Sequence, residues 1–244
     1  AMTAAAAMVQ SMESLPLAAR VTGGSDSRGG GDGPVVVLLH GFGAPGDDLV
    51  ALSGVLDMPE GTRFVFPEAP LELPPEYMGG RAWWWIDLEA RMRRRARGEA
   101  PDVHEVPEGL HEVSAKVNAF LTEIERIFAP APGKLLLGGF SQGAMLALDV
   151  ALRYPRALAG VVLMSATHIA AGEWEARYEP RRGLPVFMSH GREDDLLPFA
   201  TSEALKDTLV AHGLPVTWHP FRGGHTIPQA VLDEVGAFGK RVLA

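Results

Sequence analysis

The segment Gly139-Phe140-Ser141-Gln142-Gly143 combines residue types that can perform nucleophilic chemistry. It lies between an aliphatic run at residues 134–137 and a helical pattern that begins at Gln142. A serine in a Gly-x-Ser-x-Gly turn between strand and helix sits in a strained backbone that exposes its hydroxyl. The alternative is an accidental Gly-Ser turn. The flanking elements favour the first interpretation, so we predict that Ser141 is a nucleophile.

A serine hydroxyl is a weak nucleophile near neutral pH, so it needs a general base that is itself oriented by an acid. Among eight histidines, His225 stands out because it follows Gly223 and Gly224 directly after a predicted strand. We expect its side chain to emerge at the carboxyl edge of a sheet and predict that it is the base. His190 ends another predicted strand, and we expect it to be tucked into the turn at Gly191. A lone histidine is more often structural or merely exposed.

The candidates for the orienting acid are three adjacent carboxylates, Glu193, Asp194 and Asp195. They follow the apolar run at residues 185–189, which we predict to be a strand. Only one of them can orient the base, and the residue pattern alone leaves the choice open.

Attack on a carbonyl also needs hydrogen-bond donors for the oxyanion that forms. The backbone N–H of Gln142, directly after the predicted nucleophile, is one candidate. The second should come from a loop after an early strand, and Leu39-His40-Gly41-Phe42-Gly43 has the glycines to turn an N–H toward the site. We predict that Phe42 supplies it; the alternative is a plain glycine turn.

Strand-like and helix-like segments alternate along the chain and would position these residues. The apolar runs predict strands at residues 35–39, 63–66, 134–137, 160–164, 185–189 and 216–220. Helical patterns predict helices at residues 47–56, with Asp47 and Asp48 as N-cap candidates, and at 110–128, 142–154 and 199–212. The alternation predicts an α/β fold with a mostly parallel central sheet and helices on both faces.

The sequence contains no repeat and no linker that divides it into two domains. We expect residues 1–33 to be a mobile N-terminal lead that could include a first edge strand and a flexible Gly-rich loop at 23–33. Residues 34–244 should form one catalytic domain. Two segments interrupt the alternation: a loop at 67–87 rich in Pro and Trp, and an Arg-rich insertion at 89–99. We expect the insertion to be a solvated helical face or disordered, rather than an anion or membrane contact.

Composition excludes several classes of protein. The 244 residues include 22 basic and 30 acidic side chains, for a net charge of −8, which argues against a nucleic-acid partner. The chain has no cysteine, so disulfides, thiolate metal sites and a cysteine nucleophile are excluded. No apolar run approaches the length of a transmembrane segment, and the first residues lack the pattern of a secretory signal. We expect a soluble, cytoplasmic protein without metal or cofactor, although a secreted protein trimmed of its signal would look the same.

Six blocks of the sequence resemble the phospholipase/carboxylesterase family of α/β hydrolases. These blocks are Leu38-Leu39-His40-Gly41-Phe42-Gly43, Phe66-Pro67-Glu68-Ala69-Pro70, Arg81-Ala82-Trp83-Trp84, Gly138-Gly139-Phe140-Ser141-Gln142-Gly143, His190-Gly191-Arg192-Glu193-Asp194 and Gly224-His225. The chain order of serine, acid and histidine is also that of this fold. The resemblance implies an α/β-hydrolase fold, a catalytic triad of Ser141, Asp194 and His225, and an oxyanion hole formed by Phe42 and Gln142.

The resemblance also suggests a small-molecule substrate, a carboxylic ester with a short to medium acyl chain. We expect Ser141 to lie at the floor of a groove walled by residues 71–85, with contacts from Leu71, Leu73, Tyr77, Met78 and Trp84. The alternative is that Trp83 to Trp85 only pack the core beneath this loop. Two other functions remain open: an acyl-protein thioesterase or lysophospholipase with the same triad, and a catalytically silent binding module.

Overall fold

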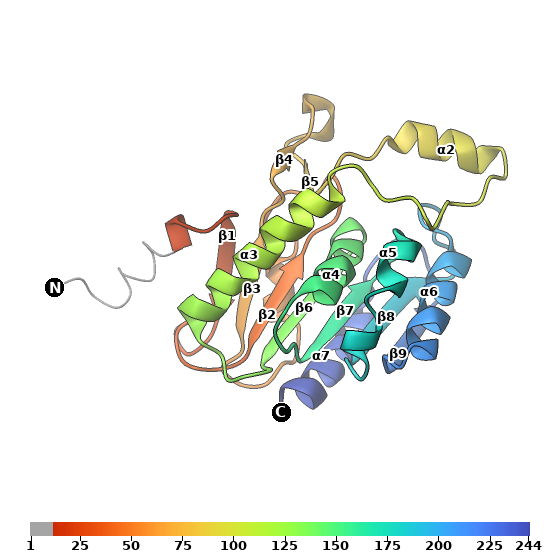
Figure 1. Cartoon of the computed structure of the whole chain (residues 1–244). Coiled ribbons are helices and arrows are strands. Elements are labelled where there is room, and N and C mark those ends of the chain that lie inside the picture. Colours follow the sequence, from red (N-terminus) through yellow and green to blue (C-terminus); the bar gives the residue numbers. More distant parts are fainter. Residues whose placement is uncertain (1–11) are drawn as a thin grey trace.

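A seven-stranded sheet is the centre of residues 12–244, the part of the chain that the computed structural model describes (Figure 1). The strand order is β1-β3-β2-β6-β7-β8-β9. The edge strand β1 is antiparallel to β3, and all other neighbours are parallel. The strands are β1 (Ala19–Gly23), β2 (Val35–Leu39), β3 (Arg63–Pro67), β6 (Leu135–Phe140), β7 (Gly160–Met164), β8 (Val186–Gly191) and β9 (Val216–Phe221). Of the predicted lead at residues 1–33, the first eleven residues lie outside the described part of the chain, and residues 19–23 form the edge strand β1.

Side chains that alternate along the central strands enter two separate hydrophobic clusters. In β2, Val35, Val37 and Leu39 pack into one cluster, whereas Val36 and Leu38 pack into the other. A strand covered on both faces needs an uninterrupted apolar sequence, which is why the predicted strands read as continuous runs of Val and Leu.

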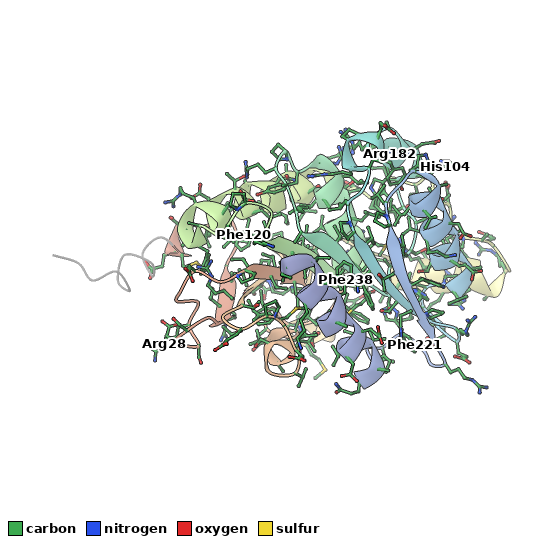
Figure 2. The ribbon with its side chains drawn as sticks, turned by 90° about the horizontal axis from the view of Figure 1, so that it is seen from below. Arg28, His104, Phe120, Arg182, Phe221 and Phe238 are labelled. Atoms are coloured by element: carbon green, nitrogen blue, oxygen red, sulfur yellow. The ribbon has the colours of Figure 1, made fainter. Side chains whose placement is uncertain are left out.

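Helices cover both faces of the sheet. The helices are α2 (Leu88–Ala96), α3 (Leu110–Phe128), α4 (Gln142–Arg153), α5 (Ala171–Glu175), α6 (Phe199–Ala211) and α7 (Gln229–Leu243). Figure 2 shows Phe120 of α3 and Phe238 of α7 on opposite sides of the sheet, and the two residues belong to different clusters. The prediction of a mostly parallel sheet between two helical layers is therefore confirmed. None of the helices within residues 12–244 is long and apolar enough to cross a membrane.

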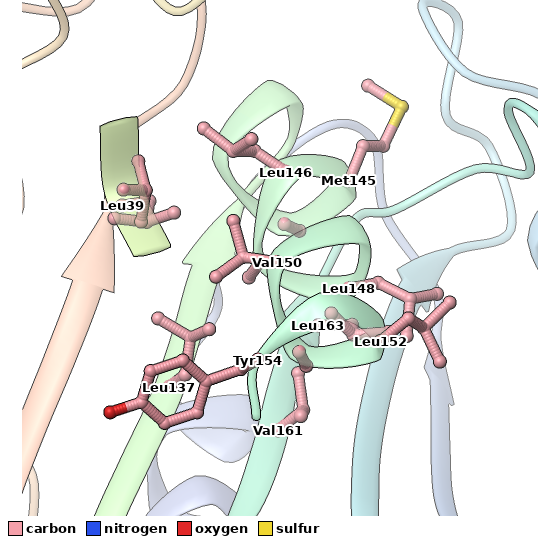
Figure 3. Packing of buried hydrophobic residues seen from close by; sticks show 14 of the residues in the cluster. Leu39, Leu137, Met145, Leu146, Leu148, Val150, Leu152, Tyr154, Val161 and Leu163 are labelled. Atoms are coloured by element: carbon pink, nitrogen blue, oxygen red, sulfur yellow. The ribbon is translucent and has the colours of Figure 1, made fainter. Parts of the chain in front are cut away.

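Helix α4 is buried along almost its whole length, and it is the helix that begins directly after Ser141. Every residue from Gln142 to Leu152 is buried. Figure 3 shows its apolar side chains, among them Leu146 and Val150, packed against Leu39, Leu137 and Leu163 of three neighbouring strands. This packing fixes the start of α4 relative to the ends of β2, β6 and β7.

The loop at residues 67–87 contains more regular structure than the sequence predicts. The short strands β4 (Leu71–Glu72) and β5 (Arg81–Ala82) pair in an antiparallel hairpin with the 3₁₀ turn η2 (Pro75–Tyr77) between them. Pro74 and Pro75 lie at this turn, where the loss of an N–H donor costs little, so they are compatible with the hairpin. In Figure 1 the hairpin and α2 project from the same end of the sheet.

Several helix predictions need correction. Residues 47–56 form only the 3₁₀ turn η1 (Val50–Gly54), which starts after Leu49 and has no side-chain cap, so the expected α-helix and its Asp caps are wrong. Helix α7 was not predicted. A second 3₁₀ turn that was not predicted is η3 (Glu179–Arg181). In the Arg-rich insertion, α2 has no buried residue, which agrees with a solvated helical face.

The Gly-rich segment at 23–33 connects β1 to β2, and a buried arginine donates hydrogen bonds to its backbone. Arg63 of β3, only 2% exposed, donates hydrogen bonds to the carbonyl oxygens of Gly31, Gly33 and Phe128. Because the guanidinium is buried, leaving its N–H donors without acceptors would cost free energy. The carbonyl oxygens that accept these donors are therefore held in place, and this stabilises the segment.

Candidate active site

The predicted nucleophile lies at a sharp turn between β6 and α4. Ser141 has φ 56° and ψ −119°, a conformation that non-glycine residues rarely adopt. Its N–H donates to the carbonyl of Met164 on the neighbouring strand at 2.9 Å. A Cβ at Gly143 would overlap the carbonyl oxygens of Leu39 and His40, so the helix can approach β2 this closely only with glycine there. The strained turn is thus held by packing on both sides.

The structure brings Ser141, His225 and Asp194 into a continuous chain of contacts. His225 Nε2 lies 2.9 Å from Ser141 Oγ, and His225 Nδ1 lies 2.7 Å from Asp194 Oδ2. An ionised carboxylate can only accept, so Nδ1 carries the proton and the lone pair of a neutral imidazole is at Nε2. Nε2 is therefore positioned to accept the proton of the serine hydroxyl.

Asp194 is buried, and all of its oxygens are engaged. Besides His225, the backbone N–H groups of Leu196 and Leu197 donate to Asp194 Oδ1 at 2.9 and 2.8 Å. Burial alone would raise the pKa of Asp194, but the hydrogen bonds from His225, Leu197 and Leu196 outweigh burial and hold that pKa below its usual value. The side chain is therefore a carboxylate at neutral pH, and its stabilising contribution is lost only as the pH falls through this lowered pKa.

The other two carboxylates of the cluster point elsewhere. Asp195 is exposed. Glu193 is also exposed, and its Oε2 accepts the backbone N–H of Gly223 at 2.6 Å, which ties the Asp194 loop to the His225 loop. A Cβ at Gly191 would overlap the carbonyl oxygen of Gly224, so the two loops touch through backbone at this glycine. Of the three candidates, only Asp194 reaches His225.

The two predicted oxyanion donors lie on loops that flank Ser141. Gln142 is the first residue of α4, so its N–H has no acceptor within the helix. The N–H of Phe42 has no backbone or side-chain acceptor among residues 12–244, whereas the next N–H, of Gly43, donates to Arg81 at 2.8 Å. A Cβ at Gly41 would lie 3.5 Å from Ser141 Cβ, which places the Phe42 loop directly beside the serine.

Three buried polar side chains position these loops, and the sequence analysis assigned them no role. The Gln142 side chain accepts the N–H of Trp83 at 2.9 Å and donates to the carbonyl of Trp84 at 2.8 Å. The indole N–H of Trp83 donates to the carbonyl of His40 at 2.8 Å. His40 Nε2 accepts the N–H of Ala69 at 3.0 Å, so its Nδ1–H donates to Gly41 O at 2.9 Å.

This network joins the hairpin loop to the Ser141 turn and to the loop of Phe42. Burial lowers the pKa of His40, so the imidazole is neutral and can serve as both donor and acceptor. The signal in the sequence was His40, which directly follows the apolar run at 35–39, because a polar side chain in an apolar context is expected to have a hydrogen-bond partner.

The predicted substrate-contacting residues divide into exposed and buried sets. Leu73 and Trp84 are buried, Trp84 within the larger hydrophobic cluster, which favours the core-packing alternative for these two. Leu71 and Met78 are exposed, Met78 to 93%. Tyr77 is half-buried.

Three aromatic rings form a cluster next to the Ser141 turn. The rings of Phe42, Tyr77 and Trp85 lie 5.8 to 6.1 Å from one another, centroid to centroid. Trp85 is 51% exposed, so of the three consecutive tryptophans it is the one that presents its side chain outward. We define Phe42, Tyr77 and Trp85 as the aromatic wall of the site.

Helix α2 lies close to the Asp194 loop, and two carboxylates compensate part of the positive charge of its arginines. Arg93 pairs with Glu89 at 2.7 Å, and Arg94 and Arg97 pair with Glu99 at 3.3 and 2.7 Å. Arg95 donates to the backbone carbonyl of Asp194 at 3.3 Å. No group of three or more His, Asp or Glu side chains within the described range 12–244 is arranged to hold a metal ion.

Comparisons with known proteins agree on one family. A sequence profile described as Phospholipase/Carboxylesterase matches residues 27–242. An acyl-protein thioesterase 1 of Gibberella zeae is 28% identical over 85% of this chain and 90% of its own length. A carboxylesterase-named protein of Oryza sativa subsp. japonica is 31% identical over 79% and 81%. The crystal structure of esterase PE8 superposes with a TM-score of 0.76 at 31% identity and covers 92% of this chain and all of that one.

Proposed function

The chain belongs to the phospholipase/carboxylesterase family of hydrolases, and from this premise we propose that it is a serine hydrolase that cleaves carboxylic esters through an acyl-enzyme on Ser141. The observation that carries the proposal is the contact chain from Ser141 Oγ to His225 and on to Asp194, at 2.9 and 2.7 Å. A serine with a base and a buried acid in this order has the parts that acyl transfer requires.

In the first half of the proposed reaction, Ser141 Oγ attacks the carbonyl carbon while its proton moves to His225 Nε2. Asp194 stabilises the imidazolium and stays ionised, because its pKa is held below the usual value by His225, Leu197 and Leu196 against the effect of burial. The tetrahedral intermediate then collapses, and His225 returns the proton to the departing alcohol oxygen. The acyl group is left as an ester of Ser141.

In the second half, water replaces the alcohol. His225 Nε2 takes a proton from water as the hydroxide adds to the acyl carbon, and it gives that proton back to Ser141 Oγ when the carboxylic acid leaves. In both halves the negative charge on the former carbonyl oxygen would face the N–H groups of Gln142 and Phe42. Preorganised donors of this kind each contribute roughly 3 kcal/mol to lowering the barrier.

The close approach of α4 to the end of β2 predicts the effect of a single added methyl group. In Gly143→Ala, the new Cβ would overlap the carbonyl oxygens of Leu39 and His40, so the loop of Phe42 must move away from Ser141. We expect kcat for an activated ester to fall about 100-fold, as when one oxyanion donor is lost. Gly172→Ala is the matched control, because no atom lies within 4 Å of its Cβ. Wild-type kcat in Gly143→Ala would contradict the proposed oxyanion geometry.

The aromatic wall leads us to propose a short to medium acyl chain as the substrate's apolar part. Each methylene buried against such a surface contributes ~0.8 kcal/mol, so kcat/KM should rise about fourfold per added carbon and then reach a plateau. In Tyr77→Ala we expect a shallower rise, measured with p-nitrophenyl esters of graded length. Met78→Ala should change the profile less, because Met78 is 93% exposed. The control is Val210→Ala, an exposed apolar residue on α6. A flat profile from acetate onward, unchanged in both variants, would mean that this loop does not form the acyl site.

A second candidate function is acyl-protein thioesterase activity, which the names of relatives such as the Gibberella zeae protein favour. The same residues could attack a thioester, since the acyl-enzyme is identical and only the leaving group differs. Values of kcat/KM for an oxoester and a thioester of one acyl chain, followed over chain length, decide between the two. A cytoplasmic location remains part of the proposal, on the basis of the sequence.

A further inference from the structure

The Asp194 carboxylate is approached by a second histidine besides His225. His190 is the penultimate residue of β8 and is fully buried. Its Nε2 lies 2.9 Å from the carbonyl oxygen of Leu197 and 3.3 Å from Asp194 Oδ2. The carbonyl of Leu197 can only accept, so Nε2 carries a proton that it donates to Leu197, and the Asp194 carboxylate lies beside that N–H.

The other ring nitrogen of His190 fixes the protonation state. Within residues 12–244, Nδ1 is buried and has no hydrogen-bond partner. A proton there would be a buried, unpaired charge, and burial lowers the pKa of His190. The titratable groups that act on the ring are Asp194 and His225, and the ring of Phe199 packs beside it at 6.1 Å. His190 is therefore a neutral donor at its Nε2 atom.

The two neighbours of His190 Nε2 are the two ends of the loop that carries the carboxylate, Asp194 and Leu197. The N–H of Leu197 already donates to Asp194 Oδ1 at 2.8 Å, while its carbonyl receives His190. His190 therefore holds the loop at Leu197, and its Nε2 lies beside the same Oδ2 atom that receives the Nδ1–H of His225 at 2.7 Å.

We propose that His190 is a positioning residue for catalysis, a second histidine whose Nε2–H holds Leu197 and so keeps the Asp194 carboxylate in the orientation that His225 requires. This inference rests on the proposed function. The Nε2–H dipole, 3.3 Å from Oδ2, also stabilises negative charge on that oxygen. Removing it should make Asp194 a stronger acceptor for the imidazolium of His225 and a less well oriented one for the neutral ring.

The test compares three substitutions at His190. His190→Met keeps the volume but removes the donor, and we expect kcat to fall about tenfold and the acid limb of the kcat/KM pH profile to move to higher pH. His190→Gln can place an amide N–H near the Nε2 position and should restore both values. His190→Asn places its amide near Nδ1 and should not. His212→Met is the control for loss of a histidine that packs on an aromatic ring, since the ring of His212 lies 4.8 Å from that of Tyr178 and makes no contact with Asp194.

The outcomes separate a positioning role from a structural one. A folded His190→Met enzyme with wild-type kcat and an unmoved acid limb would overturn the inference, as would equal defects in His190→Gln and His190→Asn. If His190→Met does not fold, the Gln and Asn pair decides alone. Failure of the proposed function is distinguishable, because the wild-type enzyme would then turn over neither esters nor thioesters.

Discussion

Replacing Ser141 by alanine is expected to lower kcat for an activated ester by about 10⁴- to 10⁶-fold, and His225→Ala should cause a loss of similar size. Ser141 Oγ and His225 Nε2 lie 2.9 Å apart and in the proposed reaction would exchange one proton, so either change would disable the same step. The double variant should therefore lose little more than either single variant. The measurement is single-turnover and steady-state kinetics of the three enzymes on one substrate. Losses that multiply would contradict a shared proton-transfer unit.

A covalent probe gives an independent control for the same prediction. A fluorophosphonate should label the wild-type protein at Ser141 alone, and labelling should be absent from Ser141→Ala. Labelling that persists in Ser141→Ala would show that another residue is the nucleophile. The probe also separates an inactive nucleophile from an unfolded protein when it is combined with a thermal melt.

The second large effect is expected at the buried acid. Asp194→Asn should lower kcat by up to about 10⁴-fold, because an amide can donate to His225 Nδ1 and so favours the imidazole tautomer whose proton is on Nε2. In that tautomer the ring cannot accept the proton of Ser141. The present carboxylate allows only the productive tautomer, since it accepts from Nδ1 at 2.7 Å.

Asp195→Asn is the matched control for this substitution. The two residues are adjacent and undergo the same chemical change, but Asp195 is exposed whereas Asp194 is buried among its donors. We expect Asp195→Asn to keep nearly full activity. A larger loss at Asp195 than at Asp194 would overturn the assignment of the acid.

Most of the fold could be predicted because its elements have strong internal patterns. The apolar run at 160–164 and the helical pattern at 110–128 coincide with β7 and α3. A strand buried on both faces gives a continuous apolar run, and a helix buried along one stripe gives apolar residues at helical spacing. Helix α7 was not predicted although Val231, Leu232, Val235 and Phe238 recur at helical spacing. Gly236 and Gly239, which are poor helix formers, interrupt this stripe, yet both glycines let the helix pack closely against Asp57 and Met58. Such packing comes from tertiary structure and leaves no local signal.

The candidate site, too, could be predicted only in part. The residues that would react lie next to glycines and strand ends, which makes Ser141 and His225 prominent in the sequence. Among three consecutive tryptophans, however, no local pattern tells that Trp84 is buried and that Trp85 faces outward. The contacts of Gln142 with the backbone of Trp83 and Trp84 join segments almost sixty positions apart, and a single sequence does not report such distances.

The backbone at Ser141 also bears on how evolution can change this protein. A glycine would adopt φ 56° freely, whereas a serine in such a conformation costs roughly 1–3 kcal/mol. The free energy of unfolding of a domain is typically only about 5–15 kcal/mol, so the strain at this one position lowers it by a noticeable fraction. Selection for a reactive hydroxyl therefore keeps the sequence away from its most stable form. Mutations that stabilise the scaffold elsewhere are the ones that leave such a lineage free to explore new substrates.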